Sequence, residues 1–289
     1  MTMRPFQKTV DRLCEISRRG YTNPYEAIEW PESLPPDGLC TSPELISIYG
    51  TPTYDALTTE QRAKLSFFEA INFYSLNIAG EKPLVEGLAS RLHKKRFESY
   101  SPYLHHFLDE ENKHMIYFGT FCTKYAGRIY PNKKVPLGRR EYADGEEDFL
   151  FFAKVMVFEE LVDVFNQRMA KDDRLIPVAR HINFLHHQDE TRHLVFGRQM
   201  VHDLFREYAP KWSLEELASV RETIAGYFNA TWREYHNPQI YRDTGLSNAY
   251  AIYEEGFDHE ASRARRRDVS SSCVKLLMNL EVLLEEPVV

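Results

Sequence analysis

The strongest constraint on the fold of this chain is a metal-binding sequence pattern that occurs twice. Residues 109–114 (DEENKH) and 189–193 (DETRH) each contain an acidic residue followed by Glu-x-x-His. About one long helix upstream of each motif, a glutamate lies in an apolar stretch: Glu81 in LNIAGEKPLVEGLA and Glu159 in FFAKVMVFEELVDVF. Twenty-nine residues separate the first glutamate from that of its motif, and thirty separate the second. The matched repetition predicts two helical hairpins that together hold a pair of metal ions.

Helix geometry explains why this spacing suits metal binding. Each residue of an α-helix advances by about 100°, so a Glu and a His three residues apart can face the same ion. About thirty residues let the chain climb one helix and return along the next, which brings the upstream glutamate to the motif. Carboxylates mixed with imidazoles suit iron or manganese. The predicted ligands are Glu81, Glu111, His114, Glu159, Glu190 and His193.

Two of these positions have competitors. Glu69 and Glu86 lie on the same predicted helix as Glu81, but they leave 41 and 24 residues before the motif glutamate, which fits a simple hairpin less well. Glu160 directly follows Glu159, and the stripe of apolar residues that shares its helix face is not much weaker than the stripe beside Glu159. The sequence therefore favours Glu81 and leaves the choice on the third helix open.

Further polar residues flank the predicted ligands. Glu110 and Asp189 each precede a motif glutamate, where they either accept the ring N–H of an opposing histidine or lie on the surface. His186 lies four residues before one motif glutamate and seven before its histidine, within about 60° of both around the helix. We therefore expect His186 as a seventh ligand, whereas His187 points about 100° away.

Aromatic residues lie on the predicted ligand faces of the helices. Tyr74, Phe107, Phe118 and Phe152 are candidates for an apolar substrate chamber, although aromatic stripes at helical spacing are more typical of plain core. Arg192, inside the second motif, either pairs with a substrate carboxylate or bonds a neighbouring acid.

Composition limits the classes of function. The chain of 289 residues carries a net charge of −7, which argues against nucleic acid as a partner, and its short basic run at 263–267 is interpreted as a solvated helix face. The longest apolar stretch, 149–158, is too short to span a membrane, and no signal peptide is evident. The four cysteines are scattered, which is typical of reduced thiols in a cytoplasmic protein.

The rest of the chain has helical patterns, with almost no alternation of period two, so the predicted class is all-α, and the two duplicated hairpins suit a four-helix bundle core. A capping box at Thr58 and Gln61 opens the first long helix, which Gly80 and Pro83 are expected to kink or break. Loops are expected near 127–147. We expect a single domain, 1–289, which comprises an irregular segment at 1–57, the metal-binding bundle at 58–208 and additional helices at 209–289. Expected helices lie at 58 through 81, 101–127, 147–170, 175–208, 213–236, 248–267 and 270–285.

This arrangement resembles the p-aminobenzoate N-oxygenase family of dinuclear iron arylamine oxygenases, and the resemblance implies a ferritin-like four-helix bundle core with extra helices. The resemblance rests on the repeated Glu and Glu-x-x-His, on the H-x-x-x-E-x-x-H motif at 186–193, and on the segment SPELISIYGTPTYDALTTEQR at 42–62. It covers about residues 40–205, and beyond 205 only the helical character matches. The resemblance implies one ion held by Glu81, Glu111 and His114 and a second held by Glu159, Glu190, His193 and His186, with Glu111 and Glu190 bridging.

The resemblance also implies the chemistry. Two iron ions, with a manganese–iron pair left open, would activate O2 to oxidise a small aromatic or amine substrate, most simply by N-oxygenation of an arylamine. An external electron donor such as a ferredoxin or reductase would supply electrons, and we expect a homodimer.

Other functions remain open from the sequence. The same site would serve ring or C–H hydroxylation or desaturation. Iron storage and the generation of a radical for a partner enzyme are two further classes. The length, the irregular N-terminal segment, the helices after 210 and the added His186 argue against storage.

Overall fold

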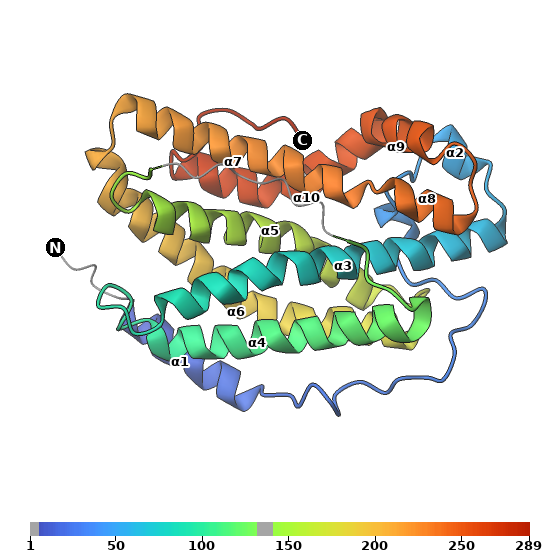
Figure 1. Ribbon diagram of the computed structural model, residues 1–289, viewed down its shortest axis with the longest axis horizontal. Coiled ribbons are helices and arrows are strands. Elements are labelled where there is room, and N and C mark those ends of the chain that lie inside the picture. Colours follow the sequence, from blue (N-terminus) through green and yellow to red (C-terminus); the bar gives the residue numbers. More distant parts are fainter. Residues whose placement is uncertain (1–5, 132–140) are drawn as a thin grey trace.

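Two hairpins of long helices form the centre of the molecule (Figure 1). The computed structural model describes residues 6–131 and 141–289, and the helices of the hairpins make its most extensive contacts. The regular secondary structure in these ranges consists of helices joined by turns and loops, apart from one isolated bridge between Leu39 and Leu175. The predicted all-α bundle is confirmed. The four central helices are α3 (Thr59–Arg91), α4 (Ser101–Phe121), α5 (Glu146–Lys171) and α6 (Pro177–Tyr208).

Helix α3 begins where the sequence predicts but continues beyond the expected break. The Thr58 hydroxyl accepts from the Gln61 N–H at 3.2 Å, and the Gln61 side chain accepts from the Thr58 N–H at 3.0 Å, which completes the capping box. Of the kink or break expected at Gly80 and Pro83, the break is wrong, because α3 is continuous through both. Proline removes one backbone hydrogen bond, and buried neighbours on α3 hold the helix together. A side chain at Gly80 would overlap the Phe158 ring, so this glycine permits close approach of α5.

The N-terminal segment is more regular than expected. Residues 7–19 form a helix, α1 (Gln7–Arg19), which packs mainly on α4 and buries Val10, Leu13 and Cys14. Their i, i+3, i+4 spacing is the helical signal in this stretch. The prediction of an irregular segment is therefore wrong at its start, and later it contains only short helices: η1 (Pro43–Leu45) and α2 (Pro52–Asp55).

The helices after the bundle form a second layer. Helices α7 and α10 pack against α5, while α1 lies on the α4 side (Figure 1). The boundary expected at 268–269 is wrong, because the chain breaks at His259, whose side chain accepts from the Ala261 N–H at 3.3 Å and caps α10. The C-terminal elements are η3 (Ala209–Lys211), α7 (Leu214–Tyr235), α8 (Pro238–Thr244), α9 (Ala249–Asp258) and α10 (Glu260–Asn279).

The connection between the hairpins begins with a π-turn, η2 (Cys122–Ala126), that follows α4. Gly127 ends it with φ of 67°, a left-handed conformation that glycine adopts without strain. The loop expected at 127–147 falls partly on residues 132–140, which lie outside the described residues.

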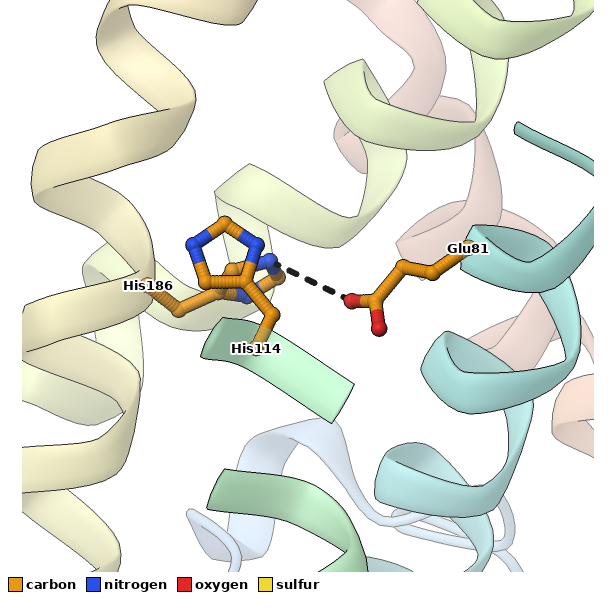
Figure 2. Close-up of side chains that lie close together, drawn as sticks. All are labelled: Glu81, His114 and His186. Carbon is orange, nitrogen blue, oxygen red and sulfur yellow. Dashed lines mark ion pairs between the residues drawn. The ribbon is translucent and has the colours of Figure 1, made fainter. Parts of the chain in front are cut away.

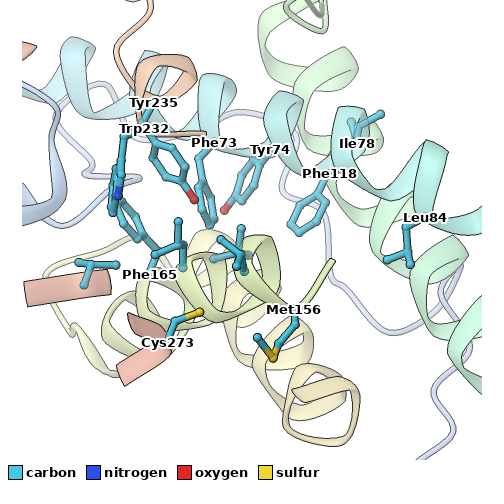
Figure 3. Close-up of a cluster of buried hydrophobic side chains, with 14 of the residues drawn as sticks. Phe73, Tyr74, Ile78, Leu84, Phe118, Met156, Phe165, Trp232, Tyr235 and Cys273 are labelled. Carbon is cyan, nitrogen blue, oxygen red and sulfur yellow. The ribbon is translucent and has the colours of Figure 1, made fainter. Parts of the chain in front are cut away.

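A continuous apolar core joins the bundle to the outer layer (Figure 3). Phe73 of α3 stacks on Phe165 of α5 with ring centroids 5.5 Å apart, and Phe165 lies 5.0 Å from Tyr235 of α7. All four cysteines are buried and free. In the described ranges, no helix has the length and apolar character needed to cross a bilayer.

Candidate metal centre

Seven acidic and imidazole side chains meet in the middle of the bundle. Helix α3 contributes one of them, α4 two, α5 one and α6 three. Each is almost completely buried, with at most 4% of its surface exposed. They form three overlapping groups whose potential ligand atoms lie within 4.8 Å of one another. We call this cluster the metal centre, and its members are Glu81, Glu111, His114, Glu159, His186, Glu190 and His193.

The grouping differs from the expected assignment in the place of His186. Its Nε2 lies 2.9 Å from a Glu190 oxygen and 3.9 Å from a Glu81 oxygen, and its ring centroid is 4.2 Å from that of His114 (Figure 2). The structure therefore groups His186 with Glu81 and His114, and not with Glu159 as expected. From α6, this side chain lies beside Glu81 of α3 and His114 of α4.

The remaining ligand atoms form the second half of the centre. Glu111, Glu159 and His193 compose one group, in which His193 Nδ1 lies 2.9 Å from a Glu111 oxygen. Glu190 reaches both halves, since one of its oxygens is 3.3 Å from His193 Nδ1 and 3.6 Å from His114 Nδ1. Glu111 also belongs to two groups. Both motif glutamates thus lie between the halves.

The hydrogen bonding of these carboxylates tests whether cations fit. Both oxygens of Glu81 and both of Glu159 are buried without a hydrogen-bond partner among the described residues, as is one oxygen each of Glu111 and Glu190. The Nδ1 atom of His114 is also unpartnered. Buried carboxylates without partners are costly unless a cation compensates them. Because these atoms converge, the donor set fits two divalent ions.

Electrostatics point the same way. Burial, together with the neighbouring carboxylates Glu111 and Glu190, raises the pKa values of Glu81 and Glu159 well above the ordinary value. The ionised forms of these groups therefore need positive charge beside them. Metal ions provide it, and oxygen and nitrogen donors without thiolates suit iron or manganese.

The outer ring nitrogens of two histidines face carboxylates. The Nε2 of His193 lies 2.9 Å from Glu110, and the Nε2 of His114 lies 3.2 Å from Asp189. A ring N–H at Nε2 that donates to a carboxylate leaves the Nδ1 lone pair directed at the centre. Glu110 and Asp189 thus fix the ligand-competent tautomer in both halves.

Two buried cations neutralise these two acids: Arg192 contacts both, and Lys113 contacts Asp189. Arg192 donates to Glu110 at 2.6 Å and to Asp189, while Lys113 Nζ lies 3.1 Å from Asp189. Of the two interpretations that the sequence left for Arg192, pairing with a neighbouring acid is the one that the contacts support. Burial opposes ionisation of Glu110 and Asp189, but the hydrogen bonds to His193 and His114, followed by the neighbouring cations, lower the pKa of each carboxyl.

The competing residues are occupied elsewhere. Glu160 pairs with Arg198, and Glu69 accepts from the backbone N–H of Ser47 at 3.0 Å. Glu86 is exposed. None of these three carboxylates belongs to the converging groups among the described residues, which favours Glu81 and Glu159 as the ligands.

Two more polar residues of the surroundings did not emerge from the sequence. The Asn166 side-chain amide lies 2.6 Å from His186 Nδ1, and Lys113 pairs with Asp189. The spacing of Asn166, seven residues after Glu159 on α5, is a usable signal because such residues share a helix face. His187 points away and pairs with Asp163 at 2.6 Å.

The four aromatic candidates pack tightly around the histidines and their own neighbours. Phe107 stacks on the His193 ring at 3.9 Å, and the edge of Phe118 meets the His186 ring at 4.9 Å. Tyr74 stacks on Phe118, and Phe152 lies 6.2 Å from Phe196. All four are fully buried. Phe107 and Phe118 thus contact histidines of the metal centre, all four rings belong to the buried core, and the substrate chamber stays a prediction.

Comparisons with known proteins identify relatives of the chain. The family model described as p-aminobenzoate N-oxygenase AurF matches residues 5–281. No curated protein matches the chain. Among solved structures, an R2-like ligand-binding oxidase from Sulfolobus acidocaldarius shares 15% identity at a TM-score of 0.47, with 96% of this chain and 92% of that chain covered. An R2-like ligand-binding oxidase without metal cofactor shares 15% identity at a TM-score of 0.45, with 89% and 95% covered.

Proposed function

The chain belongs to the p-aminobenzoate N-oxygenase family, and from this membership we propose that it binds two iron ions and N-oxygenates a small arylamine with O2. Membership makes the protein an O2-dependent oxidoreductase. The substrate, the iron pair and the ligand roles are parts of the proposal. The observation that supports it most directly is the convergence of unpartnered, buried carboxylate oxygens in the metal centre.

The metal centre divides naturally between two ions. Glu81, His114 and His186 would hold one ion, while Glu159 and His193 would hold the other. Glu111 and Glu190 lie between them and would bridge. Bound iron would supply the electrons and Lewis acidity for O2 activation. The first half has two imidazoles and the second has one, so the halves differ in the number of neutral nitrogen donors although each has one carboxylate of its own.

The surrounding residues prepare the centre for this chemistry. Glu110 and Asp189 hold protons on the Nε2 atoms of His193 and His114, which keeps Nδ1 free to bind. Phe107 and Phe118 cover the imidazole faces and exclude water from them. Water exclusion strengthens every charge interaction inside the site and protects reactive oxygen species from solvent protons.

The reaction needs a reductant. Insertion of one oxygen atom of O2 into an N–H bond, with reduction of the other atom to water, consumes two electrons and two protons. We therefore propose that an external donor protein delivers electrons. We also retain the homodimer as part of the proposal.

Product analysis of iron-loaded protein tests the proposal. Supplied with p-aminobenzoate as a representative arylamine, O2 and a chemical reductant, the protein should form hydroxylamino or nitro products that are detected by mass spectrometry. The Glu159→Ala variant should lose this activity, and Glu160→Ala should keep it, because only the first side chain lies in the metal centre. If the products are hydroxylated on the ring, the protein is a hydroxylase and the assignment of N-oxygenation is wrong. Iron oxidation without any organic product from a panel of arylamines would contradict the proposal.

A further inference from the structure

Apart from the metal centre, a concave site lies in the outer helical layer, between α7, the end of α9, α10 and the C-terminal segment. Its volume is about 640 Å³, within the range of pockets that bind small molecules. We call it the arginine pocket, because its polar lining is dominated by cations. Those cations are Arg233, Arg263, Arg266, Arg267 and Lys275. Two carboxylate side chains, Asp258 and Glu286, also line it.

The central cation of the arginine pocket is buried. Arg266 is 1% exposed, and its Nε and Nη1 atoms have no hydrogen-bond partner within the described part of the chain. Its Nη2 donates to the Val289 carbonyl at 3.2 Å. A buried guanidinium with unused donors is costly, and an anion in the cavity would compensate it.

Two of the cations converge on one aromatic ring. The guanidinium carbons of Arg266 and Arg233 lie 4.2 Å and 4.5 Å from the centre of the Phe257 ring. Among the described residues, neither arginine forms an ion pair with an Asp or Glu side chain, and Arg266 donates to the Val289 backbone oxygen. Stacking holds the two guanidinium groups in place although their like charges repel. Two guanidinium groups held on one ring, with no Asp or Glu side chain in ion-pairing contact with either among the described residues, form a preorganised site for an anion.

The remaining cations are only partly neutralised. Arg263 lies 3.4 Å from Asp258, and Arg267 pairs with Glu260. Burial, together with Arg265 and Arg263, lowers the pKa of Arg266 to about 10. Positive charge thus exceeds negative charge around the cavity even though the chain as a whole carries −7.

From this geometry we propose that the arginine pocket binds a small molecule carrying a phosphate group. The concave shape favours a small molecule over a protein surface. A phosphate provides several acceptor oxygens and up to two negative charges at one point, which matches converging guanidinium donors better than one carboxylate does. The run at 263–267 is therefore part of a binding pocket and not merely a solvated helix face.

Titration calorimetry of the metal-loaded protein with inorganic phosphate, at constant ionic strength, tests the proposal. Saturable binding is expected. The Arg233→Gln and Lys275→Gln variants remove exposed lining cations, so folding should persist, and each should weaken binding roughly tenfold. Arg206→Gln removes an exposed arginine of α6 outside the pocket and should leave binding unchanged.

Two outcomes would overturn the assignment. Equal weakening by Arg206→Gln and Arg233→Gln would show attraction to overall charge, with no built site. Binding that disappears in Glu81→Ala but persists in both pocket variants would place the phosphate on the metal ions. Failure of the arylamine assay would leave this proposal unaffected, because the arginine pocket shares no residue with the metal centre.

Discussion

Two buried glutamates on the same helix have opposite surroundings. Glu69 and Glu81 both lie on α3 and are 6% and 2% exposed. Glu69 accepts from the backbone N–H and the hydroxyl of Ser47, and that hydroxyl lies 2.9 Å from the Tyr241 hydroxyl. Glu81 has no hydrogen-bond partner for either oxygen within the described ranges. One carboxylate is therefore satisfied by protein, and the other is left for a cation.

The comparison shows that burial alone does not identify a metal ligand. Burial raises the pKa of both groups, to about 7 for Glu69 and well above the ordinary value for Glu81. What separates them is the neighbourhood: hydroxyl and amide donors around Glu69, but further carboxylates and imidazoles around Glu81. Only the second arrangement requires added positive charge.

The largest effect should come from exchanging these two residues for glutamine. Glu81→Gln should lose at least one of two bound ions per chain, because a neutral amide ligates weakly and leaves the site short of charge. Arylamine oxidation should fall at least about a hundredfold with it. Glu69→Gln, buried in the same helix, should keep both ions. Metal analysis of the purified proteins measures this, and equal metal loss in both variants would break the comparison.

A smaller effect is expected from the acid behind a ligand histidine. Asp189→Asn should weaken metal affinity by about 10- to 100-fold, because Asp189 accepts from His114 and fixes its tautomer. The matched control is Asp163→Asn, which alters a His–Asp pair with His187 outside the metal centre. Chelator competition measures the affinities. If the two variants lose affinity equally, the contact with His114 has no special role.

A third effect concerns stability at the satisfied carboxylate, where no metal ion or activity is lost. The pKa of Glu69 rises from 4.5 to about 7 on folding because burial opposes its charge, so the folded state binds the extra proton between these values. The free energy of unfolding should therefore fall as pH rises through this window, by at most about 3 kcal/mol from this group.

Glu69→Gln lacks this titration. Its stability relative to the unaltered protein should increase from pH 5 to pH 8, as measured by urea unfolding of both proteins side by side. Titrations of the metal centre are common to both proteins and cancel in the difference. A difference that does not change with pH would show that Glu69 ionises as freely in the fold as in the unfolded chain.

The sequence predicted the features that depend on local spacing. The capping box at Thr58 and the four long helices follow from patterns within a few turns. It missed α1 because prolines later in the segment obscured its short apolar stripe. It also predicted a break at Pro83, where buried neighbours keep α3 continuous. Local signals thus located the helices well and their interruptions poorly.

By itself, the sequence determined which residue types can face one another along each helix, because the helical period is fixed by backbone geometry. Only the tertiary structure decided that His186 lies with Glu81 and His114, that Glu160 turns to Arg198, and that Arg192 lies between Glu110 and Asp189. These outcomes depend on how helices rotate and pack against each other. That rotation is set by the whole core and by no single motif.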